Sequence, residues 1–418
     1  MGKELKVLMM GGQRVGKSSA LAAIMDAFTN GSASSVFRAK DTTVLQKVGR
    51  EQQTSVSQRL LDSMEWLKRN EGKIILTDSG RTDIRWDYSL ELRLNNTNDT
   101  MKMTFTDVNG EWFELNNPHS NEVRTLVSEY DVFIVAVDTT FLMEAKNPVN
   151  KLVSPVKNEK HNCIQEIHNM LTSINDNNGQ DAKLVIFVPI KCEYWVKKGL
   201  VNEVTQSVTS DYKTAIIGLC NSPSVQVEIL PIQTLGSASY HSHTEPLVFN
   251  YSERNFFFMK TRKSQRCMEL EDGKVRLSDG TIHDIAKGSV EDDPMAVMIK
   301  GTTIMRPHTW YSVDSSVYRP YNCDQVAFHI LEFMLAKRID IEIRKKEEEN
   351  GIVRKAKIIG KFILNVYSLG LWNKLCDIFG DISVAEMTNA VDKLNNLGVI
   401  RHSGDGITII KRCNFKKK

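Results

Sequence analysis

A glycine-rich octapeptide near the start of the chain has the residue types and spacing of a phosphate-binding loop. Residues 11–18 read G-G-Q-R-V-G-K-S and match the pattern G-x-x-x-x-G-K-S. Glycines let backbone N–H groups curl around an anion, and the positive end of a following helix adds to that field. In this pattern Lys17 reaches the β- and γ-phosphates and Ser18 ligates Mg²⁺. The chemistry predicted is binding of a nucleoside triphosphate by Gly11, Gly12, Gln13, Arg14, Val15, Gly16, Lys17, Ser18 and Ser19.

The residues on either side of this loop fit the elements that must position it. Residues 7–10 form an apolar run typical of a buried strand, and residues 20–28 have the composition of a helix. A strand that delivers the loop and a helix that begins behind it aim the backbone donors at one point. This order predicts an α/β fold of the P-loop NTPase kind, with a mixed, mostly parallel sheet.

The bulk composition is that of an ordinary water-soluble globular protein. The chain has 418 residues, of which 41% are hydrophobic and 25% charged, so two or three units are expected. A net charge of +3 gives no argument for nucleic acid or an anionic membrane. The seven cysteines include no CxxC pair and favour reduced thiols in the cytoplasm over a disulfide framework. The first residues run straight into a strand and no stretch of about eighteen apolar residues occurs, so we expect neither a signal peptide nor a transmembrane segment.

A second short motif ends the second strand of a predicted hairpin. Residues 88–94 and 101–107 alternate between apolar and polar and are separated by the turn-like stretch 95–99. The second strand ends in D-V-N-G, from Asp107 to Gly110. This is the layout of the Ras-like branch of P-loop GTPases, in which the aspartate holds Mg²⁺ through water and the glycine N–H senses the γ-phosphate.

The segment after residue 183 carries candidates for the nucleobase. Residues 131–138 and 183–190 are apolar runs of the kind that central parallel strands show. Where such GTPases usually have N-K-x-D, the chain has Ile190-Lys191-Cys192-Glu193. The Lys191 stem would pack on guanine, and the Glu193 carboxylate would accept from N1–H and the 2-amino group, a pair that adenine cannot donate. Because the asparagine is replaced by Ile190, an ATPase of the same fold stays an alternative.

A further strand at 227–232 is followed by Gln233-Thr234-Leu235-Gly236. This segment falls where the last base-contacting loop of such GTPases lies, which makes Thr234 a candidate base contact. Together the pieces G-G-Q-R-V-G-K-S, D-V-N-G, V-P-I-K-C-E and P-I-Q-T-L-G resemble the double-GTPase family over about residues 3–338. That resemblance implies a bacterial Ras-like GTPase with GTP and Mg²⁺ as ligands, from multi-gene systems with suspected conflict or defence roles.

Hydrolysis of GTP also needs an oriented water and positive charge at the β–γ bridge. The water-orienting glutamine that usually follows D-x-x-G is Glu111 here, which predicts slow intrinsic turnover. Glu111 is a candidate for orienting the water, against the alternative of a merely exposed acid. The switch threonine that completes the Mg²⁺ shell should lie just before the hairpin: Thr82 is the first choice and Thr77 the second. Arg81 is a candidate arginine finger in cis, against the alternative of a solvated loop arginine.

The remaining chain is predicted to hold two insertions and a second module. The expected organisation is a GTPase domain over 1–338, with a helix at about 44–69 in a first-switch insertion (30–80) and β-hairpins in a second insertion (240–301). A charged helix or linker follows over 339–357 and a winged-helix-like α+β module over 358–418. We interpret His241 and His243 as loop residues rather than metal ligands.

The C-terminal module is predicted from a capped helix ending near residue 397 and a Gly-rich hairpin after it. Its helix lacks a dense face of base-reading side chains, which favours protein partners over nucleic acid despite the basic tail. The function predicted overall is a cytoplasmic GTP-binding switch that acts through protein partners, such as an effector or a second GTPase subunit. A pseudo-GTPase scaffold that holds nucleotide without turnover is the alternative from another class.

Overall fold

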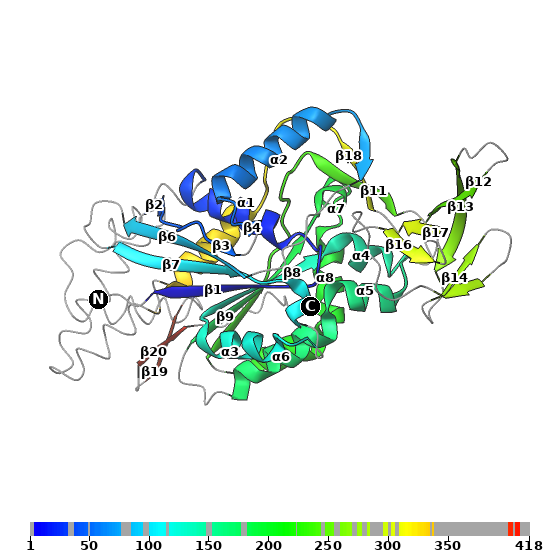
Figure 1. Ribbon diagram of the computed structural model, residues 1–418. Helices are drawn as coiled ribbons and strands as arrows, with labels where there is room; N and C mark the ends of the chain where they lie inside the picture. Colours follow the sequence, from blue (N-terminus) through cyan, green and yellow to red (C-terminus); the bar gives the residue numbers. More distant parts are fainter. Residues whose placement is uncertain are drawn as a thin grey trace.

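A seven-stranded mixed sheet forms the centre of the protein (Figure 1). The computed structural model describes residues 4–31, 37–48, 51–76, 85–94, 100–113, 117–147, 153–176, 182–222, 224–243, 247–254, 260–269, 274–277, 282–284, 296–299, 302–305, 309–334, 337, 400–403 and 406–409. The strand order is β10-β9-β8-β1-β7-β6-β2, in which only β6 runs against its neighbours. The strands are β1 (Leu5–Met10), β2 (Phe37–Asp41), β6 (Trp86–Leu94), β7 (Thr100–Asp107), β8 (Val132–Asp138), β9 (Lys183–Ile190) and β10 (Val225–Ile229).

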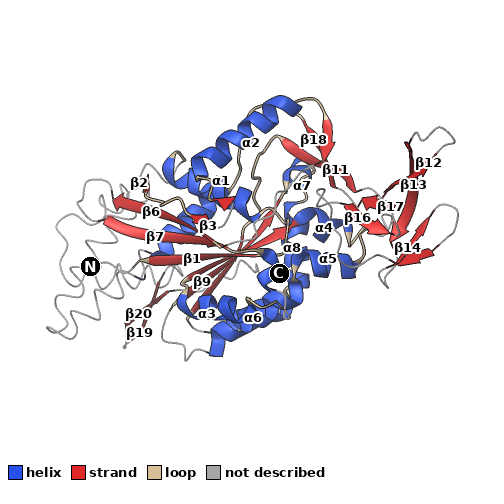
Figure 2. Cartoon of the chain, in the orientation of Figure 1, coloured by secondary structure: helices blue, strands red, loops and turns tan. Residues whose placement is uncertain are grey.

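Both faces of the sheet are covered by helices, as Figure 2 shows. Along β1 the side chains alternate, so Val7 and Met9 belong to one apolar core and Leu8 and Met10 to the other. The first core holds α1 (Lys17–Thr29) and a helical run over residues 323–334. The second holds α3 (Ser120–Glu129), α6 (Ile164–Asp176) and α9 (Lys213–Asn221). Burial on both faces explains why β1, β8 and β9 are continuously apolar in sequence. The predicted α/β fold with a mostly parallel sheet is confirmed.

The predicted hairpin is present, whereas the helix of the first-switch insertion is shorter than expected. β6 and β7 pair antiparallel with Trp86 opposite Asp107, so the strand ends where the D-x-x-G motif begins. The predicted start of the insertion helix near residue 44 is wrong, because α2 (Val56–Asn70) begins after Ser55, whose side chain accepts from the backbone N–H of Gln58. Before it lie two short strands, β3 (Lys47–Val48) and β4 (Glu51–Gln52), paired antiparallel.

A small three-stranded sheet joins the two insertions. Its order is β11-β18-β5, with β5 (Ile74–Leu76), β11 (Ala238–His243) and β18 (Thr309–Val313) all antiparallel to their neighbours. Figure 1 shows α2 crossing above α1 and leading into this sheet. The interpretation of His241 and His243 as loop residues is wrong, because both lie on β11, which pairs antiparallel with β18.

The second insertion is rich in strands, as predicted. A six-stranded sheet has the order β15-β14-β13-β12-β17-β16, and the predicted hairpin at 274–284 is its pair β14–β15. Its strands are β12 (Leu247–Arg254), β13 (Lys260–Glu269), β14 (Lys274–Leu277), β15 (Ile282–Asp284), β16 (Ala296–Ile299) and β17 (Thr302–Met305). At the C-terminus the predicted hairpin is present as β19 (Ile400–Ser403) and β20 (Gly406–Ile409). The helix predicted to precede it and the charged segment 339–357 lie outside the described residues.

The remaining elements of the described chain are short. They are the 3₁₀ helix η2 (Gly110–Phe113) and the helices α4 (Thr139–Glu144), α5 (Pro155–Asn162), α7 (Glu193–Lys197) and α8 (Val201–Asp211). No helix in the described part of the chain is both long and apolar enough to cross a membrane.

The expectation of reduced thiols holds for Cys163, Cys192 and Cys323, which are buried and form no disulfide. It is wrong for Cys220, which is disulfide-bonded and lies, partly buried, in the last turn of α9.

Candidate functional site

The glycine-rich loop between β1 and α1 adopts backbone angles that its glycines permit. Gly11 has φ 142° and Gly16 has φ 109°, and a Cβ at Gly11 would lie 2.8 Å from the carbonyl oxygen of Ala136 on β8. The loop is thus pressed against the neighbouring parallel strand. It ends at the N-terminus of α1, whose first residue is Lys17. The sequence prediction of strand, loop and helix in this order is confirmed.

Lys17 is buried at the centre of the loop. Its Nζ donates to the carbonyl oxygens of Gly11 at 3.0 Å and Gly12 at 2.9 Å. Burial lowers the pKa of the ammonium, and the nearby carboxylate of Asp107 opposes that shift. The positive charge is therefore held inside the concave face of the loop, where an anion would neutralise it.

Ser18 and Asp107 lie together beside that charge. The Ser18 hydroxyl donates to Oδ2 of Asp107 at 2.5 Å, across the 89 residues that separate them in sequence. Oδ1 of Asp107 is buried and has no hydrogen-bond partner among the described residues. Two hard oxygen groups with an unsatisfied acceptor fit Mg²⁺. No cluster of three or more His, Cys, Asp or Glu suited to a metal occurs in the described part of the chain.

The D-x-x-G segment packs directly on the loop. A Cβ at Gly110 would lie 2.3 Å from the backbone nitrogen of Gln13, so only glycine allows this approach. Next to it, the Glu111 carboxylate accepts from the Gln13 side-chain amide at 2.8 Å. The loop is thus connected to the residue predicted to orient the water, and no local sequence pattern indicates this contact.

Glu193 is placed at the first turn of α7 and is only 2% exposed. Its Oε1 accepts from the backbone N–H groups of Gly236 at 3.2 Å and Leu235 at 3.4 Å. Burial raises the pKa of the carboxyl, while these donors and Lys191 act against that rise. The loop after β10, which contains Thr234, is therefore fastened to the predicted base-binding acid.

Lys191 is held by a buried acid behind the loop. Its Nζ donates to Oδ2 of Asp138 at 2.6 Å, and the same oxygen is 3.0 Å from Nε2 of His161. These two basic groups lower the pKa of Asp138 far below its usual range, although burial alone would raise it. The Lys191 stem passes close to the phosphate-binding loop, with Cε 3.5 Å from the place of a Cβ on Gly16.

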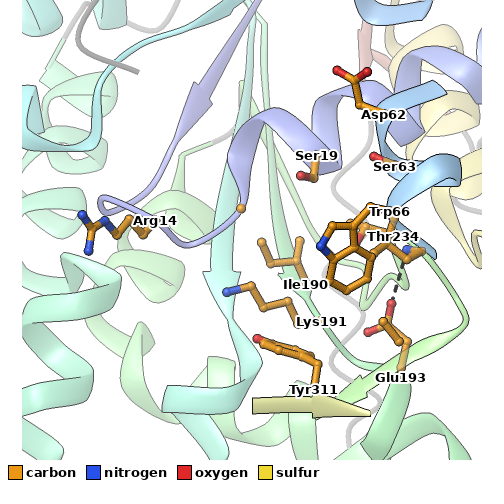
Figure 3. A pocket seen from close by; sticks show the side chains of 13 residues that line it. Arg14, Ser19, Asp62, Ser63, Trp66, Ile190, Lys191, Glu193, Thr234 and Tyr311 are labelled. Carbon is orange, nitrogen blue, oxygen red and sulfur yellow. Dashed lines mark hydrogen bonds between the residues drawn. The ribbon is translucent and has the colours of Figure 1, made fainter. Parts of the chain in front are cut away.

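One cavity connects the phosphate-binding loop with the predicted base site. Its volume is about 300 Å³, at the lower end of the range for small-molecule sites. Figure 3 shows Trp66 reaching it from α2 at the top and Lys191, Tyr311 and Glu193 from the lower side. The cavity is lined by Arg14, Gly16, Ser19, Asp62, Ser63, Trp66, Ile190, Lys191, Glu193, Thr234, Leu235, Ala238 and Tyr311.

Sequence reasoning missed the wall that α2 and β18 contribute to this cavity. Asp62, Ser63 and Trp66 have the spacing i, i+1, i+4 of one helix face, which is the only local signal that they act together. The candidates Thr82, Thr77 and Arg81 lie outside the described residues, so their roles stay predictions.

The fold and this site define a P-loop nucleotide-binding protein of the α/β class. A sequence profile of the family described as Double-GTPase 2 matches residues 7–234. This is more than half of the chain, which therefore belongs to the Double-GTPase 2 family, and the resemblance read from its motifs is confirmed.

The other comparisons are more distant. No curated protein matches the chain. Among solved structures, the chain is similar to a crystal structure of the Ski7 GTPase-like domain of S. cerevisiae bound to GTP. The two share 10% identity, the alignment covers 74% of this chain and 70% of that chain, and the TM-score is 0.31. A likeness this remote says nothing about activity.

Proposed function

We propose that the protein binds GTP with Mg²⁺, hydrolyses it slowly and acts as a molecular switch through partner proteins. The observation that carries this proposal is the cavity that connects Gly16 and Ser19 of the phosphate-binding loop with Glu193 and Thr234. A nucleotide needs both ends at once, and each end carries the chemistry its part of the ligand requires. Membership of the Double-GTPase 2 family supports guanine as the base.

At the phosphate end, Lys17 would neutralise the β- and γ-phosphates and the loop N–H groups would cradle them. Ser18 and the orphaned oxygen of Asp107 would hold Mg²⁺, directly and through water, together with Thr82 or, as second choice, Thr77. The ion would supply positive charge at the β- and γ-oxygens. Gly110, which lies against Gln13, would place its N–H at the γ-phosphate and so report whether that group is present.

At the base end, Glu193 would accept from N1–H and the 2-amino group of guanine. One oxygen already accepts from backbone, but a carboxylate has about four lone-pair sites, so two ligand donors can be accommodated. An adenine presents an acceptor at N1 and carries no 2-amino group, so it would offer the carboxylate neither of these two donors. The competing ATPase interpretation therefore predicts no role for the Glu193 charge.

For hydrolysis, Glu111 stands at the water-orienting position and is engaged by Gln13. A carboxylate accepts from water but cannot donate to the γ-phosphate, and its charge opposes the developing anion, which supports slow turnover. The same contact favours the second candidate function, a pseudo-GTPase scaffold that holds nucleotide without hydrolysis. A positive charge from Arg81 in cis would favour the enzyme.

The proposal is tested by titrating the purified protein with fluorescent GTP and ATP analogues, with and without Mg²⁺, followed by single-turnover phosphate release. Tight, Mg²⁺-dependent binding of GTP alone is expected, with phosphate released slowly. Equal binding of ATP would replace guanine specificity by a general NTPase. GTP bound throughout with no phosphate release would leave the scaffold, and no binding of either nucleotide would overturn the proposal.

We propose that the switch acts by binding a partner protein. The insertions and the C-terminal module, rather than the central sheet, would form the binding surface. Under this proposal residues 1–338 form the GTPase domain, 339–357 a charged connection and 358–418 a module that contacts protein rather than nucleic acid. A cytoplasmic location is proposed from the scattered cysteines without a CxxC pair, and a bacterial conflict or defence role from the family resemblance.

A further inference from the structure

We propose that Trp66 of α2 stacks on the nucleobase, so that the first-switch insertion forms part of the base site. This inference rests on the proposed binding of GTP and adds a contact from outside the recognised GTPase motifs. The ligand group is the flat face of a purine whose polar edge meets Glu193.

Trp66 is placed next to the residues predicted to bind the base. It lines the same cavity as Lys191 and Glu193, the two residues predicted to contact guanine. Figure 3 shows its ring entering from α2, whereas Lys191 and Glu193 enter from the lower side, where β9 ends and α7 begins. A base whose edge faces Glu193 would thus have the Lys191 stem and the indole ring as neighbours in one space.

The Trp66 side chain is only partly buried by the apolar residues that surround it. The ring packs against a small apolar cluster of Leu67, Ala238 and Val313, which fixes its orientation. The remainder of the ring faces the cavity. A rigid aromatic ring with one supported side and one side open to a ligand loses little conformational entropy when it stacks.

Helix α2, which carries Trp66, is anchored at both ends. At its start, Val56 and the partly buried Leu60 pack into the core that contains α1. Beyond its end, β5 pairs with β18, which also contributes Tyr311 to the cavity wall. Since the insertion is tied to both the nucleotide-binding core and the second insertion, stacking at Trp66 would couple occupancy of the base site to α2 and β5.

The experiment compares the affinity of the full chain for Mg²⁺–GTP and for Mg²⁺–tripolyphosphate by isothermal titration calorimetry. Tripolyphosphate occupies the phosphate end only, so it reports an intact loop without a base contact. Alanine at a base-stacking position usually weakens binding about 5- to 150-fold. We expect Trp66→Ala to lose about 10-fold or more for GTP and nothing for tripolyphosphate, and Trp66→Phe to retain most of the GTP affinity.

Leu61→Ala is the matched control, since Leu61 is the large apolar neighbour on α2 that is 54% exposed and does not line the cavity. It should leave both affinities unchanged. As a second readout, hydrogen exchange in α2 and β5 should slow on binding GTP but not on binding tripolyphosphate.

Two results would overturn the inference while leaving GTP binding in place. One is equal GTP affinity of Trp66→Ala and the unmodified chain; the other is an equal loss for GTP and tripolyphosphate, which would mean a purely structural role. Failure of the unmodified chain to bind GTP, with tripolyphosphate still bound, would instead refute the proposed function and the base contact with it.

Discussion

Replacing Glu193 by glutamine should convert a preference for guanine into one for xanthine. The substitution keeps size and leaves an amide oxygen that can accept from the N–H groups of Gly236 and Leu235, as Oε1 does now. The new amide N–H₂ would face the N1–H and 2-amino donors of guanine, whereas xanthine presents an oxygen at position 2. The fold should therefore survive while the ligand preference changes.

The magnitude follows from the burial of this carboxyl. A hydrogen bond to a charged group contributes about 1.5–3 kcal/mol, and a buried site excludes the water that would replace it. Loss of one such bond predicts a GTP affinity about 10- to 150-fold weaker, because about 1.4 kcal/mol corresponds to a factor of ten. XTP should bind the variant at least as tightly as GTP does.

The assay is calorimetric titration of GTP, XTP and ATP into the unmodified chain and the variant, with circular dichroism to verify folding. Glu203→Gln is the matched control, an exposed acid in the first turn of α8 that should change neither affinity. An unaltered ratio of GTP to XTP affinity in a folded Glu193→Gln protein would refute the assignment of Glu193 to the base, and would revive the ATPase alternative.

Three further changes test the site and its support. Gly110→Ala would place a Cβ 2.3 Å from the nitrogen of Gln13, so the D-x-x-G segment must move off the loop; we expect at least about 10-fold weaker Mg²⁺-dependent GTP binding, and unchanged binding would contradict the close packing. His243, whose pKa burial lowers to about 4, binds its proton more readily when unfolded. The contribution of neutral His243 to the free energy of unfolding is full above about pH 6.5 and falls by about 3 kcal/mol towards pH 4. In urea unfolding, His243→Gln should therefore make the free energy of unfolding depend less on pH over that window. A pH dependence equal to that of the unmodified chain would argue against a lowered pKa of His243. Asp138→Asn leaves Lys191 without its buried counter-charge and should cost about 3 kcal/mol in the same unfolding assay at pH 7; a cost under about 1 kcal/mol would show that the pair is dispensable.

The parts of the fold that sequence predicts well are those encoded by short, regular patterns. The apolar runs around Val7, Val132 and Leu184 indicate buried parallel strands because both faces of each strand are covered, and the structure places them side by side. The alternation of 88–94 and 101–107 likewise predicts the hairpin that carries Asp107. In both cases the pattern of apolar residues indicates how many faces of the strand are buried.

Contacts between segments distant in sequence could not be predicted in this way. Ile75 on β5 pairs with Tyr311 on β18, more than two hundred residues later, and no local pattern in either segment names its partner. In the sequence Trp66 is one large residue on a polar helix, and it packs against Ala238 and Val313, which lie far along the chain. The Gln13–Glu111 contact depends on how closely Gly110 approaches the loop, which is a property of the assembled backbone.

The departure from the usual N-K-x-D pattern has a physical explanation in the packing behind the loop. Ile190 is fully buried, and its Cδ1 lies 3.0 Å from the place of a Cβ on Gly16, so an apolar contact braces the loop where the usual asparagine would be. Lys191 has φ 59°, and its Nζ donates to Oδ2 of the buried Asp138 at 2.6 Å. The Lys191 side chain is thus oriented by Asp138 rather than by residue 190. Loss of the asparagine therefore does not by itself remove a base site, and the Asp138→Asn variant should weaken GTP binding more than tripolyphosphate binding if this support is what positions Lys191.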